Sequence, residues 1–326
     1  MRSFLVLALA VGCATTPPEP VVPVTPAPGV AVLAPKPTVN PAIPVPGRLV
    51  AIGDLHGDPT HALAVLQEAG ITDAAAKWVA GDTVLVQTGD VTDRGPDSRG
   101  VIRLLADLER QAPATGGRVV ALNGNHEVMN VLGDWRYVSD GDMAVYGGIE
   151  ARTAAYAPDG EDGKRLRSLD AVQLVGETVF CHGGVKPEFA ALGIEGMNRK
   201  IREAVADADA HRAPPGPDGA MPAYKSPAPI LGPEGPLWYR GYVLDPEEQA
   251  CPLLADALGK LGARRMVVGH TTRDDGRIEV RCGGALVVID TGISEHYGAH
   301  HAAWEAKAGD GGAIYPTGRE DLPDPR

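Results

Sequence analysis

The sequence predicts an α/β fold in which short parallel strands alternate with helices. Three apolar runs, at residues 49–52, 83–87 and 118–122, have the length of buried strands. Each run ends in a turn that contains Gly and Asp or Asn, and a helical apolar stripe separates the second run from the third. Strands joined by helical crossovers form parallel sheets, so we expect a sheet that is buried on both faces.

The first two predicted strands each end in a polar loop. Residues 49–52 are followed by GDLHGD at residues 53–58, and Pro59 comes next. Proline is favourable at the first position of a helix, because the N–H that it lacks would have no partner there. Residues 83–87 are followed by GDVTDRG at residues 89–95. Both loops are therefore predicted to connect a strand to a helix.

The helix after the second strand is predicted from one apolar stripe with the spacing i, i+3, i+4 and i+7. The third predicted strand, at 118–122, runs into GNHE at residues 124–127. Ligands of such sheets bind at the carboxyl ends of the strands, which is where all three polar loops fall. The apolar stripe of the helix between the second and third predicted strands consists of Val101, Leu104, Leu105 and Leu108.

Composition and charge exclude some classes of protein. The chain has 326 residues, and 30 Lys and Arg against 42 Asp and Glu give a formal net charge of −12. A protein that binds nucleic acid usually carries a basic patch, so no nucleic-acid partner is predicted. The hydrophobic content of 44% and the charged content of 22% are ordinary for a globular protein.

The N-terminus is predicted to direct export. Residues 4–11 form an apolar run that is too short to span a bilayer as a helix. The run leads into LAVGC, which ends at Cys13 and resembles the lipobox of bacterial lipoproteins. This resemblance implies a signal peptide at 1–12, lipid on Cys13, and a lipoprotein at the periplasmic face of a bacterial cell envelope, on the outer membrane because residue 14 is Ala. A plain secretory signal cut near Ala14 is the alternative.

Proline dominates the segment after the signal. Of the 29 prolines in the chain, 11 fall between Pro17 and Pro46. Proline fixes φ and lacks an N–H, so residues 14–47 are predicted to form an extended, semi-rigid polyproline tether. The chain is thus expected to hold a globular domain, at 48–326, on a membrane by its N-terminal lipid.

Six side chains that can bind metal ions follow apolar runs. Two later runs end like the first three, in CHGG at residues 181–184 and in GHT at residues 269–271. Because the carboxyl ends of parallel strands meet, the six donors are expected to converge on one sheet edge. Mixed carboxylate and imidazole donors suit first-row transition metals, and a carboxylate can bridge two of them. The predicted metal ligands are Asp54, His56, Asp90, Asn125, His182 and His270, with Asp90 as the bridge.

The ordered motifs GDLHGD, GDVTDRG, GNHE, CHGG and VGHT resemble those of the calcineurin-like metallophosphoesterases. The DRG and GHT forms are similar to the phosphoprotein phosphatase branch, and PLWYRGY at residues 236–242 resembles the bacterial Shewanella-like phosphatases. The similarity extends over about residues 48–304. It implies that the domain at 48–326 is catalytic, with a four-layered αββα sandwich and two divalent metal ions, Mn, Fe or Zn.

The resemblance also divides the ligands between the two ions. Thr272 stands where many members of the wider family have a second His, which would leave the first ion an open position for water. The implied reaction is in-line attack on phosphorus by a hydroxide held between the ions. The first ion would take Asp54, His56 and Asp90, and the second would take Asp90, Asn125, His182 and His270.

Catalytic roles follow from the same resemblance. His126 would protonate the leaving oxygen, with Asp93 as its orienting partner. Arg94 and Arg240, together with Asn125, would hold the phosphate group, because the guanidinium fork matches the geometry of phosphate oxygens.

Three classes of function stay open at this point. The resemblance favours a dinuclear-metal phosphomonoester hydrolase that acts on phosphoproteins, with phosphotyrosine, phosphoserine and phosphothreonine all in range. A phosphatase that scavenges phosphate from nucleotides or other small phosphoesters in the cell envelope would carry the same motifs. A non-catalytic binding lipoprotein would not need the complete ligand set. The sequence leaves the oligomeric state open.

Residues outside the motifs are given structural roles. Glu127 is expected to hydrogen-bond behind the ligands, and Cys181 is expected to be a buried thiol. Cys251 and Cys282 remain as the pair that can form an internal disulfide, which the sequence leaves open. Tyr297 is expected either to line the site or to pack near it. The histidines at 61, 211, 296, 300 and 301 are expected on the surface or in packing contacts, and the segments 130–170 and 195–236 have no assignment.

Overall fold

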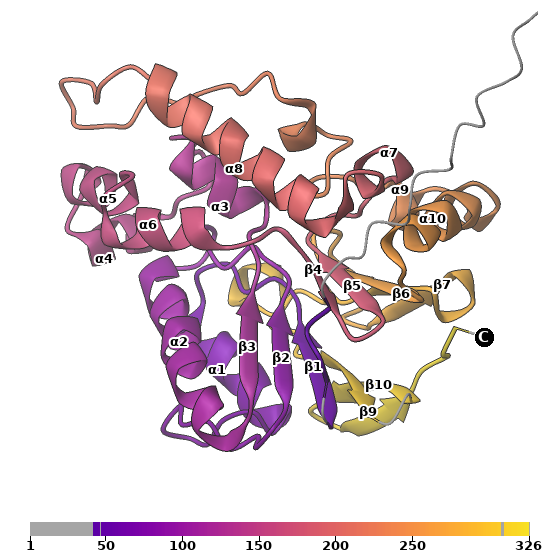
Figure 1. The fold of residues 1–326 in the computed structure, drawn as a ribbon. Coiled ribbons are helices and arrows are strands. Elements are labelled where there is room, and N and C mark those ends of the chain that lie inside the picture. The colour runs from indigo at the N-terminus through magenta and orange to yellow at the C-terminus, as the bar shows by residue number, and fades with distance from the viewer. Residues whose placement is uncertain (1–41, 46, 308–309, 326) are drawn as a thin grey trace, which may run out of the picture. The chain divides into compact units, whose positions relative to one another are not determined.

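The described residues form two β-sheets and the helices that cover them (Figure 1). The computed structural model describes residues 42–45, 47–307 and 310–325. The chain divides into two units, 1–36 and 37–326, and only the second contains described residues. The predicted signal peptide, Cys13 and most of the predicted tether therefore lie outside the described residues.

The first sheet contains β1 (Arg48–Ile52), β2 (Val84–Gln87) and β3 (Arg118–Ala121), followed in the chain by β9 (Ala303–Lys307), β10 (Asp310–Tyr315) and β11 (Gly318–Asp321). Its strand order is β11-β10-β9-β1-β2-β3. The strands β1, β2 and β3 pair in parallel, which confirms the three strands and the pairing direction predicted from the sequence. Strand β9 adds to β1 in the antiparallel direction, so the sheet as a whole is mixed.

The second sheet contains β4 (Val172–Val175), β5 (Thr178–Cys181), β6 (Arg265–Val268), β7 (Glu279–Arg281) and β8 (Leu286–Val288). Its strand order is β4-β5-β6-β8-β7, and β5, β6 and β8 run parallel. Ile43, in the short described segment before β1, pairs with Val175 of β4.

Helices α1 (Pro59–Glu68) and α2 (Ser98–Gln111) follow β1 and β2 and lie beside the first sheet (Figure 1). Each begins with an aspartate cap. The side chains of Asp58 and Asp97 accept hydrogen bonds from the backbone N–H groups of the third helical residues, which satisfies donors that have no partner within the helix. In the predicted stripe of α2, Leu104 is partly buried and the other three residues are buried.

Further helices lie in the segments that the sequence left unassigned. Three of them lie within 130–170, and the longest, α8, extends into the segment 195–236 as far as His211 and crosses the upper part of the view in Figure 1. The bounds are α3 (Asn125–Val131), α4 (Asp140–Tyr146), α5 (Ile149–Tyr156), α6 (Glu161–Ser168), α7 (Pro187–Ala190), α8 (Gly193–His211), α9 (Gly241–Leu244) and α10 (Glu247–Leu261). Short 3-10 helices are η1 (Ala112–Thr115), η2 (Pro229–Leu231), η3 (Cys282–Gly284) and η4 (Glu295–Tyr297).

Alternate residues of β1 face two different hydrophobic cores. Leu49 belongs to one buried cluster with Phe180 of β5 and Val267 of β6. Val50, the next residue, belongs to a second cluster that includes Leu105 of α2. Because side chains alternate across a strand, the two sheets face each other through the first cluster, and helices cover their outer faces. This arrangement confirms the predicted αββα sandwich.

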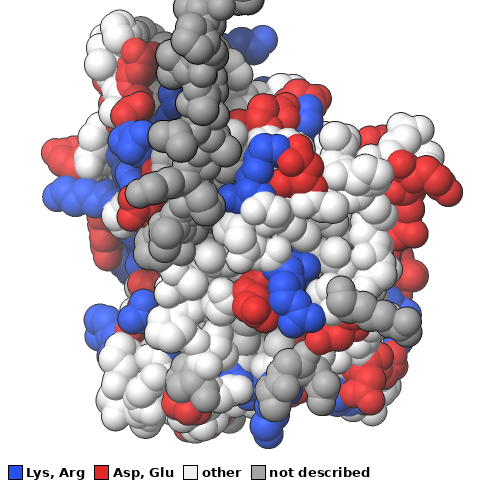
Figure 2. All heavy atoms as spheres, turned by 45° about the vertical axis from the view of Figure 1, so that its right-hand side comes forward, with Lys and Arg blue, Asp and Glu red and all other residues white. Residues whose placement is uncertain are grey.

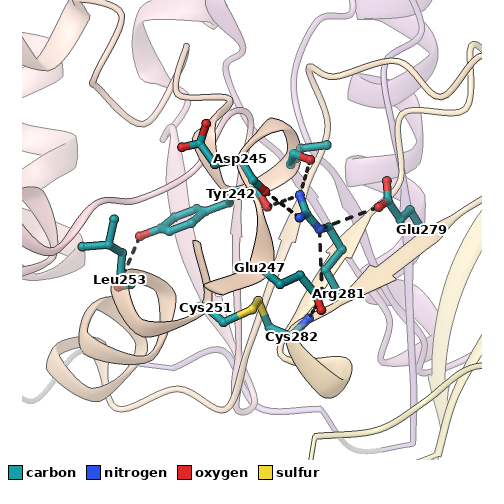
Figure 3. Close-up of a disulfide and its surroundings, with 9 residues drawn as sticks. Tyr242, Asp245, Glu247, Cys251, Leu253, Glu279, Arg281 and Cys282 are labelled. Atoms are coloured by element: carbon teal, nitrogen blue, oxygen red, sulfur yellow. Dashed lines mark hydrogen bonds and ion pairs between the residues drawn. A yellow bond between two sulfur atoms is a disulfide. The ribbon is translucent and has the colours of Figure 1, made fainter. Parts of the chain in front are cut away.

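A disulfide joins Cys251 of α10 to Cys282, the residue after β7 (Figure 3). The sequence left this pair open, and the structure forms it. The neighbouring side chain of Arg281 donates hydrogen bonds to the carbonyl oxygens of Tyr242 and Asp245, at 2.8 and 2.7 Å (Figure 3). Arg281 thereby fixes the end of α9 on β7. Cys181 is buried and unpaired, as predicted.

The visible surface carries both signs of charge. Figure 2 shows one face on which Lys and Arg lie among Asp and Glu without a continuous basic patch. This mixture of charges on the visible face accompanies a formal net charge of −12 for the whole chain. Within the described ranges, no helix has both the length and the apolar character needed to cross a bilayer.

Candidate metal centre and active site

The predicted metal donors meet at the carboxyl ends of strands from both sheets. The expectation of a single sheet edge is therefore wrong. The two sheets face each other, so strand ends that are far apart in sequence come together between them. The donors of the first sheet are Asp54 and His56 after β1, Asp90 after β2 and Asn125 after β3, and those of the second sheet are His182 after β5 and His270 after β6.

Asp90 lies at the centre of these donors. Its Oδ2 atom is 3.8 Å from Nε2 of His56 and 3.2 Å from Nε2 of His182. Nε2 of His182 is also 2.9 Å from Oδ1 of Asn125, and Oδ2 of Asp54 is 3.9 Å from Nε2 of His56. Donors bound at about 2.1 Å to one ion are roughly 3.0–3.4 Å apart. The observed separations are therefore close to those that a bound ion requires.

Three histidine rings are oriented to leave a lone pair toward the cluster. A carbonyl oxygen can only accept a hydrogen bond, so each ring donates its N–H to a backbone carbonyl. The lone pair of its other nitrogen is then available to a metal ion. The nitrogen without a hydrogen is then Nε2 in His56 and His182 and Nδ1 in His270, where Nη2 of Arg240 also lies 3.5 Å away. The accepting carbonyls are those of Thr92 for His56, Thr88 for His182 and Trp238 for His270, at 3.1, 3.0 and 3.1 Å.

Burial and neighbouring groups keep three of the donors in the protonation states that bind metal ions. Burial lowers the pKa of His56 to about 4, and burial together with the neighbouring His182 lowers the pKa of His270. Both rings are therefore neutral near pH 7. Burial alone would raise the pKa of Asp90, but His182 and His126 hold it well below its usual value, so this carboxylate is ionised.

The site holds an excess of buried acidic groups. Burial and the neighbouring Asp290 and Asp90 raise the pKa of Asp54, and burial and Asp90 raise the pKa of Glu127. Like charges in a low-dielectric interior repel one another, and a divalent cation would offset that repulsion. The donor chemistry, the spacing and the electrostatics therefore all fit a site for two divalent ions.

Two sets of three donors, each with atoms within 4.8 Å of one another, share Asp90. One set is Asp90 with His182 and His270, as predicted for the second ion. The other is Asp90 with His56 and His126, whereas the sequence placed Asp54 beside His56 and gave His126 another role. The contact of His126 Nδ1 with Asp93, at 2.6 Å, leaves only Nε2 of this ring facing the cluster.

The loops that carry these residues have unusual backbone conformations. Positive φ is rare outside glycine, and it clusters at sites where function requires the strain. Glycine is needed beside them: a Cβ on Gly89 would overlap the backbone of Gly124, and a Cβ on Gly124 would overlap the carboxylate of Asp90. The five site residues with positive φ are His56, Asp90, Asp93, Arg94 and His270.

Glu127 holds the Asp90 loop through backbone contacts. Its Oε2 atom accepts hydrogen bonds from the N–H groups of Asp90 and Gly124, both at 2.7 Å. Its Oε1 atom accepts from the N–H groups of Val91 and Thr92, at 2.9 and 3.0 Å. The side chain is fully buried. Glu127 therefore positions the loop and the start of α3, in agreement with its expected role behind the ligands.

A buried chain of hydrogen bonds runs from His126 into the helical segment 140–156. Nδ1 of His126 lies 2.6 Å from Asp93 Oδ2, and Asp93 Oδ1 accepts from Asn130 Nδ2 at 2.9 Å. Oδ1 of Asn130 accepts from Arg152 at 2.7 Å, and Arg152 also pairs with Asp142 at 3.2 Å. Arg152 is fully buried, with its guanidinium against the rings of Trp135, Tyr146 and Tyr156.

Two neighbouring carboxylates, one of them in this chain, determine the electrostatics of His126. Burial alone would lower its pKa, but the carboxylates of Asp90 and Asp93 raise the pKa to about 9. The protonated ring, which can give a proton to a leaving oxygen, is therefore favoured. The sequence named Asp93 as the partner of His126, and it did not identify Asn130 or Arg152.

Loss of Arg152 should destabilise the fold. Arg152→Met should lower the free energy of unfolding by about 3 to 5 kcal/mol, because it leaves the buried carboxylate of Asp142 without its partner. Chemical denaturation followed by circular dichroism measures this change. An exposed arginine of α8, Arg199, provides the control, and Arg199→Met should change stability by less than about 0.5 kcal/mol. Equal effects of the two substitutions would contradict the role given to Arg152.

A cavity of about 240 Å³ opens over the candidate metal centre. The predicted Arg94 and Arg240 both line it, although they come from distant segments. The guanidinium of Arg94 stacks on Tyr137 at 3.9 Å, and that of Arg240 donates to the carbonyl oxygen of His270. The other lining residues are Asp54, His56, Asp90, Asn125, His126, Trp238, His270, Thr272 and Tyr297.

Sequence reasoning missed several residues of this region. Tyr137 lies in the unassigned segment 130–170, and no pattern indicated it. Trp238 stands in the quoted PLWYRGY segment, where only Arg240 received a role. Asp290 follows the apolar run 286–289 as Asp54 follows β1, so the same strand-end signal could have identified it. Tyr297 lines the cavity with its ring 4.9 Å from that of His56, the first of the two expectations for it.

Comparison with known proteins gives a consistent result. The sequence profile of the calcineurin-like phosphoesterases matches residues 47–274. An uncharacterised protein of Schizosaccharomyces pombe is 38% identical over 286 residues, 86% of this chain and 83% of that protein. The Shewanella-like protein phosphatase 2 of Arabidopsis thaliana is 32% identical over 298 residues, 77% of this chain and 72% of that protein.

One group of solved structures is similar over most of the fold. The crystal structure of a cold-active protein-tyrosine phosphatase from a psychrophilic Shewanella species superposes with a TM-score of 0.71. The two sequences are 26% identical, and the match covers 86% of this chain and 82% of that one. The similarity therefore extends over most of both chains.

Proposed function

Because this chain belongs to the calcineurin-like phosphoesterases and is a metal-dependent phosphatase, we propose that it dephosphorylates proteins. The observation that carries the proposal is the cavity itself. Six metal donors form its floor or lie directly behind it, and two arginines and three aromatic rings line it. The named relatives with this fold, a Shewanella-like protein phosphatase and a protein-tyrosine phosphatase, act on phosphoproteins according to their names.

We assign the metal ligands by chemistry and position. Asp54, His56 and Asp90 would hold one ion. Asp90, Asn125, His182 and His270 would hold the other, with the Asp90 carboxylate common to both. When bound, such ions act as Lewis acids that activate water and polarise a phosphoryl group. The donor set suits Mn, Fe or Zn.

Two arginines would bind the phosphate group. Nε of Arg94 is buried and has no hydrogen-bond partner among the described residues, and an unpaired buried donor of this kind is costly unless a ligand accepts from it. Arg240, which also lines the cavity, donates to the carbonyl oxygen of His270 and to the hydroxyl of Thr271. With the amide of Asn125, these groups would surround the oxygens of a phosphate bound in the cavity.

His126 would act as the general acid. Its Nε2 atom faces the cavity, while Asp93 holds its Nδ1 atom. The ring therefore would give its Nε2 proton to the oxygen that leaves phosphorus, and Asp93 would keep the ring in the orientation for transfer. No covalent bond between the enzyme and phosphorus is required.

The aromatic residues at the cavity favour phosphotyrosine among the substrates. Tyr137, Trp238 and Tyr297 line the cavity and offer ring faces against which an aryl group can pack. Phosphoserine and phosphothreonine are also expected substrates, because the groups that would bind phosphate do not contact the alcohol from which it is released.

Assays of the purified protein on matched phosphotyrosine, phosphoserine and phosphothreonine peptides and on nucleotides test the proposal. A kcat/KM for nucleotides that exceeds that for every peptide would favour a small-molecule phosphatase.

Removal of Arg240 should weaken phosphate binding without loss of metal. Arg240→Ala should raise the inhibition constant of inorganic phosphate by roughly 10- to 100-fold, because a charge-assisted hydrogen bond contributes about 1.5 to 3 kcal/mol. The inhibition constant is measured from initial rates and the metal content by elemental analysis. Arg199→Ala, at an exposed position of α8, serves as the control. An unchanged phosphate inhibition constant in Arg240→Ala would remove Arg240 from the site.

We also propose that the protein is an envelope lipoprotein. The support is the sequence around Cys13, which lies outside the described residues. Cys13→Ser in the full-length chain should abolish lipid attachment and shift the exported protein from the detergent phase to the aqueous phase, with its phosphatase activity unchanged. One acyl chain binds membranes only weakly, so firm retention requires several. Mass spectrometry that finds an unmodified N-terminus after residue 13 would support the plain secretory signal instead.

A further inference from the structure

A second cluster of histidines and carboxylates lies outside the phosphatase site. His61 of α1 and His301, just before β9, face each other with Nδ1 of His61 2.8 Å from Nε2 of His301. The two residues are 240 positions apart in the chain. Their side chains are 21% and 12% exposed, so water reaches the pair only partly. The sequence expected both histidines to have surface or packing roles.

The outer nitrogens of the two rings are both held by carboxylates. Nε2 of His61 is 3.2 Å from Oε2 of Glu295. Nδ1 of His301 is 3.1 Å from both carboxylate oxygens of Glu68, the last residue of α1. The carboxylate of Asp58 lies farther off, 4.0 Å from Nε2 of His61. Three acidic groups therefore surround two imidazole rings.

When both outer nitrogens donate to their carboxylates, the cluster lacks one positive charge between the rings. An ionised carboxylate can only accept, so an outer nitrogen that bonds to one carries a hydrogen. A neutral imidazole has a single N–H, so the N–H group of each ring then points to a carboxylate and away from the other ring. The inner nitrogens of His61 and His301 are left as two lone pairs 2.8 Å apart, which repel each other. A cation between them would remove this repulsion.

The geometry fits a transition-metal ion between the rings. Two nitrogens bound at about 2.0–2.1 Å to one ion are roughly 3.3–3.4 Å apart at the tetrahedral angle and roughly 2.8–3.0 Å apart at the 90° angle of octahedral coordination. The observed 2.8 Å fits the octahedral angle. Histidines that bind metal ions also typically donate their other N–H to a carboxylate, as Glu295 and Glu68 allow here. Imidazole selects ions such as Zn²⁺ over Ca²⁺ or Mg²⁺.

We propose that His61 and His301 form a peripheral site for a divalent transition-metal ion of the Zn²⁺ type, with Glu68 and Glu295 as positioning residues. Water would complete the coordination. The site links α1 to the segment that precedes β9, and Glu295 belongs to η4 together with Tyr297, which lines the catalytic cavity. An ion at this site would thus fix the short helix that presents Tyr297. The proposal does not depend on the substrate of the phosphatase.

The number of bound ions tests the proposal. The full chain, loaded with its catalytic metal ions, is dialysed against buffered Zn²⁺, and bound metal is counted by elemental analysis. Wild type should bind one ion more per chain than His301→Gln. His211→Gln, at an exposed histidine of α8, should bind as many ions as wild type. Since all three proteins keep every catalytic ligand, the comparison does not depend on how the catalytic centre is filled.

The positioning carboxylate gives a second, graded test. Glu68→Gln keeps the shape of the side chain but removes its charge, and it should weaken the additional Zn²⁺ by roughly 10- to 100-fold. Thermal unfolding of each variant, followed by circular dichroism, shows whether it is folded, and His61→Gln replaces His301→Gln if the latter is not. Equal metal counts in wild type and the folded histidine variant would overturn the proposal. That result would mean that a shared proton fills the position between the rings.

Discussion

Asp90→Asn should remove bound metal and abolish hydrolysis while the fold is retained. Asp90 is the one donor shared by both three-residue sets, and its Oδ2 atom faces histidines of both. Asparagine has the same shape, and its Oδ1 atom can still accept the hydrogen bond that Asp90 receives from the N–H of His126. The substitution removes the negative charge that would hold two cations together. Metal ions contribute several kcal/mol to such reactions, so turnover should fall by about 10³-fold or more.

The measurement combines metal analysis, turnover and circular dichroism on one preparation. Asp82→Asn provides a matched control, because Asp82 is exposed and lies two residues before β2, whereas Asp90 lies just after it. This control should retain its metal and its activity. An Asp90→Asn protein that keeps both ions and hydrolyses normally would contradict the bridging role of Asp90.

His126→Asn should lower turnover by roughly 10²- to 10⁴-fold with the metal content unchanged. The loss should be smaller for para-nitrophenyl phosphate than for an alkyl phosphate, because a nitrophenolate leaves without a proton. Asp93→Asn should act in the same direction, since it disturbs the orientation of the ring. The readout is the ratio of kcat values on the two substrates, which a purely structural defect would not change.

His211→Asn serves as the control for this substitution, because His211 is exposed and pairs only locally with Asp207. Loss of metal in His126→Asn would instead assign His126 to the first ion, beside His56 and Asp90, as their donor geometry allows. Equal losses for aryl and alkyl phosphates would show that His126 is not the acid.

The parts of the fold and site that could be predicted share one property: they are encoded locally. Apolar runs followed by Gly and Asp or Asn gave β1, β2 and β3 within a residue or two, and the polar residues of these turns are the ones that the structure gathers. Strand ends must carry the site because only there can short loops from several strands meet. The sequence DTG at residues 290–292, after β8, has the same form. The same signal therefore also indicates Asp290.

The parts that could not be predicted depend on contacts between distant segments. Arg152 reaches Asn130 and Asp142 from a helix whose sequence carries no motif, so its burial has no local signal. Tyr137 takes its role from stacking on Arg94, which only the folded chain brings near. The meeting of donors from two sheets, rather than at one sheet edge, is likewise a property of packing; the family resemblance implied the two-sheet sandwich, and the strand pattern alone did not. Periodicity within a strand indicates that a face is buried, but not what covers it.

The dependence of phosphopeptide hydrolysis on bound metal tests the central claim most directly. The purified protein is stripped with a chelator, and its turnover and metal content are followed as a divalent ion is added back. Hydrolysis should be absent in the metal-free protein and should return as the catalytic centre takes up two ions per chain. Full hydrolysis of the phosphopeptide by the metal-free protein would contradict the dinuclear account.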